Sequence, residues 1–140
     1  MKRSKLLCFF ILMGLVFSSA VMADEKTGTT ATPGPNTVSQ ASSPITIQTG
    51  EYDLKTIILE FSPGVGMAKH MHGGHVLATV LQGEMTLNDK AGERILRAGE
   101  SWTEGPGDQH SVVNAGTTAA RVVVNMMLPK GAEPTTRIKQ

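Results

Sequence analysis

The sequence predicts one small all-β domain, a sandwich or barrel, behind an N-terminal export signal and a flexible linker. Three observations lead to this prediction. The chain has 140 residues, a length that suits a single domain. From residue 45 onward, short apolar or alternating runs are separated by glycine-containing turns. No run in that region has the 3.6-residue period of an amphipathic helix.

The first 23 residues have the three parts of a secretory signal peptide. Residues 2–5 are basic, residues 6–17 are an apolar run too short to span a bilayer comfortably, and Val21-Met22-Ala23 offers a small-residue cleavage site. We therefore expect cleavage after Ala23 and a periplasmic or secreted protein. The single cysteine, Cys8, lies inside the apolar run and is removed with it, so the mature chain forms no disulfide.

The mature chain is close to neutral. Of the 13 Lys and Arg residues, three lie in the signal peptide, which leaves ten against 12 Asp and Glu. No basic patch indicates nucleic-acid binding, and no second apolar run predicts a membrane contact after cleavage. Residues 24–44 are rich in Thr, Ser, Ala, Gly and Pro, and they have too few large apolar side chains to offset the cost of ordering. We interpret them as a disordered linker.

The expected strands follow one another between residues 45 and 129. Each shows period-two alternation or is a short apolar run, and each is bounded by turn-forming residues. They are expected at 45–49, 53–61, 75–82, 84–88, 93–97, 101–104, 110–114 and 120–128. Pro129 ends the last strand, and residues 130–140 are expected to form a polar C-terminal tail.

All four histidines lie in two glycine-containing segments. His70, His72 and His75 fall within six residues, and His110 follows Gly105-Pro106-Gly107. If the first segment is a strand, His70 and His72 point to the same face. Paired neutral imidazoles suit Zn, Cu, Fe and Ni, whereas the alternative is a polar strand face in water. The second histidine-bearing turn favours the metal site.

These two segments resemble the two motifs of the cupin superfamily. The first motif is Gly, five residues, His-x-His, three or four residues, Glu, six residues, Gly. The second is Gly, five residues, Pro-x-Gly, two residues, His, three residues, Asn. The matching residues are Gly64, His70, His72 and Gly83, then Gly99, Gly107, His110 and Asn114. The second motif places its proline at position 105, and in this sequence the proline is one residue later, at Pro106.

The resemblance covers residues 45–129 and is that of a small single-domain, type-2-like cupin. It implies a single jelly-roll (double-stranded β-helix) barrel with the histidines pointing into its mouth. It also implies a divalent transition metal, with Fe, Mn, Zn, Ni and Cu all compatible with the ligands. A small-molecule ligand or substrate and a homodimer are further implications.

One position departs from the family pattern. The glutamate of the first motif falls on Val76, which cannot bind a metal. Either His75 replaces this ligand, with Gly73-Gly74 absorbing the change of strand face, or His75 points outward at the barrel rim. In the second case the other three histidines form the centre, with open positions for water or substrate.

Three more residues are candidates near the site. Asn114 and Glu104 are candidate acceptors for the outer N–H of a metal-bound imidazole. Glu104 is alternatively the missing carboxylate ligand, or a solvent-facing residue at a strand end. Trp102 is either a core residue or an aromatic platform for a ligand. The methionines leave copper as a minor alternative, because thioethers favour Cu(I) but also fill ordinary cores.

The sequence supports two functions. The first is a metal-dependent oxygenase, isomerase or lyase that acts on a small molecule, with the chemistry supplied by the metal because no nucleophile motif is present. The second is a non-catalytic periplasmic module that binds a small molecule or a metal, which the valine at position 76 favours. A regulatory sensor is less favoured, because no segment is left to form a DNA-binding domain.

Overall fold

A computed structural model describes residues 37–139, in which the regular secondary structure is β-strand throughout. The strands are β1 (Tyr52–Phe61), β2 (Gly66–Met71), β3 (His75–Gln82), β4 (Glu84–Asp89), β5 (Gly92–Arg97), β6 (Ser101–Glu104), β7 (His110–Val113), β8 (Ala120–Pro129) and β9 (Thr136–Arg137). The predicted all-β class is therefore confirmed. Within this part of the chain, no helix offers the length and apolarity needed to cross a membrane.

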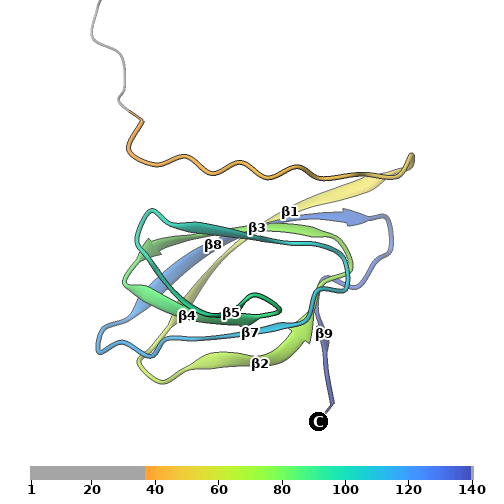
Figure 1. Ribbon diagram of the computed structural model, residues 1–140. Helices are drawn as coiled ribbons and strands as arrows, with labels where there is room; N and C mark the ends of the chain where they lie inside the picture. Colours follow the sequence, from red (N-terminus) through yellow and green to blue (C-terminus); the bar gives the residue numbers. More distant parts are fainter. Residues whose placement is uncertain (1–36, 140) are drawn as a thin grey trace, which may run out of the picture. The chain divides into compact units, whose positions relative to one another are not determined.

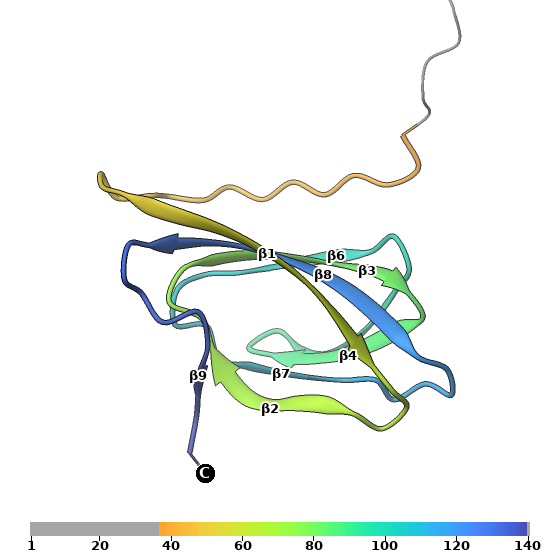
Figure 2. The same cartoon turned by 180° about the vertical axis from the view of Figure 1, so that it is seen from behind.

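The strands form two antiparallel sheets that face each other (Figure 1). The four-stranded sheet has the order β1-β8-β3-β6, and the five-stranded sheet has the order β5-β4-β7-β2-β9. Figure 2 shows the same arrangement from behind, with β8 between β1 and β3. Strands far apart in the sequence are thus neighbours in both sheets, as is typical of a jelly roll, and the predicted barrel is confirmed.

The core lies between the two sheets, because alternate residues of the central strands point inward. In β3 the buried residues are Val76, Ala78 and Val80, and in β8 the even-numbered residues from Ala120 to Leu128 are buried. The buried apolar side chains are Phe61, Val76, Ala78, Val80, Met85, Leu87, Leu96, Trp102, Val112, Ala120, Val122, Val124, Met126 and Leu128.

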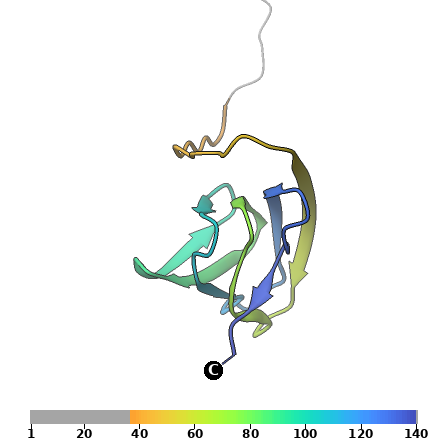
Figure 3. The same ribbon diagram turned by 90° about the vertical axis from the view of Figure 1, so that its right-hand side faces the viewer.

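The segment before β1 is not a strand, although residues 45–49 alternate. Residues 37–51 have no ladder partner and are exposed, and they run along the outer side of the four-stranded sheet (Figure 3). Their contacts with the sheets are scattered hydrogen bonds, among them those from Ser39 Oγ to the Gly99 carbonyl and from Thr103 Oγ1 to Ser43 Oγ. Alternation alone therefore does not make a strand here, because the segment does not pair with a strand of either sheet. The expected signal peptide at 1–23 and most of the expected linker lie outside the described residues.

The segment after β8 is part of the fold. β9 pairs with β2, so that Thr136 lies opposite Met71 and Arg137 lies opposite His70. The backbone N–H of Ile138 donates to the Lys69 carbonyl at 2.9 Å. Residues 136–138 therefore join the five-stranded sheet beside the histidines, within a segment for which the sequence pattern predicts only a polar tail.

Candidate metal centre

A β-bulge in β2 brings His70 into the barrel. Met67 lies opposite Val112 of β7, and His70 lies opposite His110, so three steps along β2 match two along β7. The extra residue reverses the parity of the strand, and both Met67 and His70 face inward as a result. His72, two residues further on, keeps the inward direction of His70 and is buried.

A tight turn before β7 places His110. Gly107 has φ +78°, in the region that favours glycine, and its N–H donates to the His72 carbonyl at 2.9 Å. Asp108 Oδ2 accepts the Gly105 N–H at 2.9 Å. The hydrogen bond from Lys90, together with that from Gly105, holds the pKa of Asp108 below its usual range, so this carboxylate stays ionised and keeps the turn closed.

Backbone carbonyls fix the orientation of all three buried rings. Nδ1 of His70 lies 2.8 Å from the Ala68 carbonyl, Nδ1 of His72 lies 2.6 Å from the Pro134 carbonyl, and Nδ1 of His110 lies 3.2 Å from the Asp108 carbonyl. A carbonyl oxygen can only accept a hydrogen bond, so each Nδ1 carries the proton. Each neutral ring therefore presents the lone pair of Nε2, which is the arrangement that metal-binding histidines require.

His70, His72 and His110 together can hold a metal ion. One potential ligand atom from each ring lies within 4.8 Å of the others, and all three residues are buried. The ring centroids are 4.1 to 5.2 Å apart. The donors are neutral nitrogens, which suit the divalent transition metals that the sequence predicts without choosing among them.

The carboxylate of Glu104, at the end of β6, lies against two of these rings. Its Oε1 accepts the Trp102 indole N–H at 2.5 Å and lies 3.0 Å from His110 Nε2. Its Oε2 lies 3.2 Å from His72 Nε2, yet it is buried and has no hydrogen-bond donor within the described part of the chain. A bound cation would satisfy both this orphan oxygen and the inward lone pairs, so the residues present fit a metal.

Two of the histidines have pKa values shifted in opposite directions. Burial lowers the pKa of His70, and the neighbouring His110 and His72 add to that effect. Burial also lowers the pKa of His72, but the Glu104 carboxylate, which would accept a hydrogen bond from Nε2 of the protonated ring, and the Pro134 carbonyl outweigh it and raise that pKa above the ordinary value. Among these two rings, His72 therefore takes up a proton more readily in the metal-free protein.

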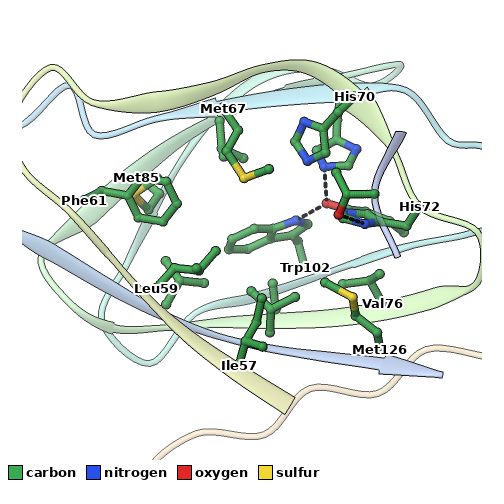
Figure 4. Close-up of a pocket in the computed structure, with 17 residues that line it drawn as sticks. Ile57, Leu59, Phe61, Met67, His70, His72, Val76, Met85, Trp102 and Met126 are labelled. Carbon is green, nitrogen blue, oxygen red and sulfur yellow. Dashed lines mark hydrogen bonds and ion pairs between the residues drawn. The ribbon is translucent and has the colours of Figure 1, made fainter. Parts of the chain in front are cut away.

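The three rings close one end of an interior cavity of about 50 Å³ (Figure 4). The rest of the wall is largely apolar and includes Ile57, Leu59, Phe61, Met67, Val76 and Met126. One water needs about 10–15 Å³ measured in this way, so the space accommodates only a few small groups. The arrangement places a polar, metal-ready end against an apolar chamber, as is usual for small-molecule sites.

His75 does not join the other histidines. Its ring lies on the outer face of the four-stranded sheet, where Nε2 is 3.1 Å from the Thr46 carbonyl. Val76, Ala78 and Val80 are the buried residues of β3, so His75, one residue before Val76, points to the opposite, outer face of that strand. Gly73-Gly74 serves close packing, because a Cβ on Gly74 would lie 2.1 Å from the Met127 carbonyl.

The structure also places the other candidate residues. Asn114 is fully buried and donates to the carbonyls of Phe61 and Thr118 at 2.8 Å each, so it ties loops together and none of its hydrogen bonds reaches a histidine. Trp102 is a buried cavity residue whose N–H holds Glu104. The groups that orient the rings are instead backbone carbonyls. Sequence reasoning missed them because any residue carries a carbonyl, and the one at Pro134 lies beyond the expected domain boundary.

The comparisons with known proteins agree with this fold. The family model described as "Cupin domain" matches residues 57–126. A search of curated proteins found no match. The chain resembles an uncharacterized protein with a double-stranded β-helix domain from Klebsiella pneumoniae, at 21% identity and TM-score 0.54, over 69% of this chain and 91% of that one.

Two enzymes share the fold over part of their length. An oxalate oxidase solved in complex with the substrate analogue glycolate matches at 22% identity and TM-score 0.53, over 61% of this chain and 46% of the oxidase. The polyketide cyclase RemF from Streptomyces resistomycificus matches at 20% identity and TM-score 0.54, over 62% of this chain and 61% of the cyclase. At these identities the likeness is one of fold.

Proposed function

The chain belongs to the cupin family, since the matched region makes up half of its 140 residues, and we propose that it binds a divalent transition metal at His70, His72 and His110. One observation carries the proposal. Three buried imidazoles, each with Nδ1 held by a carbonyl, direct their Nε2 lone pairs toward one point beside an unpaired carboxylate oxygen. A cluster of acceptors without donors is costly unless a cation occupies its centre.

The metal and the cavity together support a metal-dependent enzyme that acts on a small molecule. Three protein nitrogens leave open positions, at which a bound metal supplies Lewis-acid or, for Fe, Mn and Cu, redox chemistry. The chain's own part is to exclude water and orient the reactant: the apolar wall encloses it, and the small volume limits it to a few non-hydrogen atoms. Oxygenase, isomerase and lyase reactions are all compatible with this site.

A non-catalytic binding module is the second candidate, and the small volume of the cavity favours it over a site for large substrates. The two are separated by removing the metal. An enzyme loses turnover with the metal and regains it on reloading, whereas a metal-free binder keeps its affinity for the small molecule after chelation. A module whose ligand is the metal itself would bind the metal tightly and would turn over no small molecule.

The proposal is tested by metal content and affinity. The untagged exported protein is analysed for bound metals, and Zn²⁺ is titrated calorimetrically into the chelator-treated protein. His70→Ala, His72→Ala and His110→Ala should each lose the near-stoichiometric metal. His75→Ala is the matched control and should keep it, because that ring lies on the outer face. A wild-type protein that neither contains nor takes up metal would overturn the proposal.

Export and pairing complete the proposal. A periplasmic or secreted location rests on the signal-like composition of residues 1–23.

A homodimer is supported by apolar residues on the outer face of the four-stranded sheet. Leu54 and Ile58 of β1 are 76% and 64% exposed, and Leu77 and Leu81 of β3 are also exposed. β8 offers no free edge for pairing, since β1 and β3 occupy both its sides.

A further inference from the structure

Glu104 lies beside the three-histidine group, and its carboxylate contacts two of the three rings. It ends β6, and its register partner on the neighbouring strand β3 is Val76. Both residues line the cavity, so both point to the inner face of the sheet. Glu104 is only 7% exposed, and its carboxylate lies against the ring of His72. A carboxylate buried this deeply is rare unless it is paired or bound to a metal.

The contacts of the carboxylate have the spacing of neighbouring ligands around one ion. Metal-bound nitrogen and oxygen atoms lie about 2.0–2.2 Å from the ion, which sets adjacent ligand atoms roughly 3 Å apart. Glu104 Oε1 is 3.0 Å from His110 Nε2, and Oε2 is 3.2 Å from His72 Nε2. In the neutral rings these nitrogens carry lone pairs, so without a cation each contact would set acceptor against acceptor.

We infer that Glu104 is the carboxylate ligand of the metal centre, supplied by β6, and that Trp102 is the residue that positions it. The inference rests on the proposed metal site. The indole N–H of Trp102 takes one lone pair of Oε1 and leaves Oε2 without any other donor, so Oε2 is free to bind the ion. One anionic oxygen beside three imidazoles favours a divalent ion such as Mn²⁺, Fe²⁺, Co²⁺ or Zn²⁺ over Cu(I).

The test uses Co²⁺ as the probe and the metal-free mature protein at about pH 8, above the ordinary pKa of histidine. Binding is followed by Co²⁺ absorption and by quenching of Trp102, the only tryptophan of the chain. Glu104→Gln should weaken Co²⁺ binding by about tenfold to a hundredfold or more and change the absorption spectrum. It should also raise the thermal stability of the metal-free protein, because the amide donates to the ring lone pairs that the carboxylate cannot satisfy.

Two further variants make the result specific. Glu60→Gln is the matched control, since Glu60 is exposed and pairs only with Arg121, and it should bind Co²⁺ like the wild type. The double variant Val76→Glu/Glu104→Val moves the carboxylate to the register partner on the same face and should recover most of the lost affinity. This double variant also keeps the inference testable if Glu104→Gln fails to fold.

The outcomes separate this inference from the proposal on which it rests. If the wild type binds Co²⁺ and Glu104→Gln binds it equally well with an unchanged spectrum, Glu104 is not a ligand, while the three-histidine site stands. A loss that the double variant does not recover would also overturn the ligand role, because it would indicate a disturbed site rather than a missing carboxylate. If the wild type binds no Co²⁺, the metal site itself fails first.

Discussion

At the scale of single residues, the site is defined by which nitrogen of each ring carries the proton. The carbonyls of Ala68, Pro134 and Asp108 hold the protons on the outer nitrogens, so the inner nitrogens of the three histidines are ready to bind without rearrangement. Two of these rings differ in proton affinity. Burial lowers the pKa of His70, whereas the neighbouring Glu104 carboxylate raises the pKa of His72. Of these two rings, we therefore expect His72 to be the one at which a proton competes more strongly with a metal.

Metal affinity should fall as the pH is lowered, and His72 should be the first cause. Because its pKa is raised, His72 becomes protonated at a pH above the ordinary histidine value, whereas His70, with its lowered pKa, stays neutral to a lower pH. Zn²⁺ affinities measured by calorimetry between about pH 5.5 and 8.5 give the pH at which the affinity begins to fall. Glu104→Gln removes the main influence that raises the pKa of His72, so the Zn²⁺ affinity of this variant should begin to fall at a lower pH than that of the wild type. If both proteins lose affinity from the same pH, His72 is not the group responsible.

Asn114 should matter for stability and little for the metal. Asn114→Ala leaves the buried carbonyls of Phe61 and Thr118 without a donor, at a cost of about 1–3 kcal/mol for each unsatisfied group. Thermal denaturation should show a lower Tm, by about 4–8 °C per kcal/mol for a domain of this size. The Zn²⁺ affinity of the folded variant should equal that of the wild type. A large loss of affinity at unchanged Tm would instead place Asn114 in the metal centre.

At the scale of elements, three backbone features assemble the centre: the bulge in β2, the turn before β7 and the segment that follows β8. The bulge is required because Met67 and His70 are three residues apart and both face inward. The segment after β8 brings the Pro134 carbonyl to His72 and then pairs with β2 as β9. A centre built from side chains of two strands is thus held in place by three separate backbone segments.

Removing the segment after Pro129 should impair the metal centre. The truncated protein loses the carbonyl that holds His72 and the pairing of β9, so we expect Zn²⁺ affinity to fall by about ten- to a hundredfold. Circular dichroism tests whether the barrel remains folded. A control truncated after Ile138 retains both contacts and should bind normally. Equal affinity of the two truncated proteins would contradict a role for this segment.

Much of the fold could be predicted from the sequence, because alternation and turn residues act locally. The strands at 75–82 and 101–104 were predicted to the residue. β9 was missed because two residues carry no pattern, and 45–49 was overpredicted because a strand needs a partner as well as alternation. The spacing of His70 and His72 indicated their shared direction. The outward direction of His75 depended on how Gly73-Gly74 packs against the Met127 carbonyl, which the sequence does not encode locally.

At the scale of the whole molecule, the two faces of the four-stranded sheet have different uses. The inner face encloses the cavity, and the outer face carries an apolar patch made of Leu54, Ile58, Leu77 and Leu81. Val123 and Met127 of β8 lie between the strands that contribute these residues. Met127 pairs with Leu54 and Val123 pairs with Ile58, so the patch is continuous across β1 and β8, whereas Asn125 separates Leu77 from β1. An exposed apolar surface of this kind is expected where another chain binds.

Ile58→Lys should abolish the proposed homodimer. The substitution places a charge in the middle of the patch, 64% exposed in the single chain, and so should cost the single chain little stability. Light scattering coupled to size-exclusion chromatography should show the wild type as a dimer and the variant as a monomer. Lys55→Glu, on the same strand but outside the patch, is the control. A wild type that is monomeric at all concentrations would contradict the proposed interface.

The position of the Pro134 carbonyl has a consequence for biosynthesis. His70, His72 and His110 all emerge from the ribosome before the residues that hold His72 in place. A growing chain therefore contains every histidine of the centre before it contains the carbonyl that orients His72. We expect such a chain to bind the proposed ion less tightly than the finished domain does.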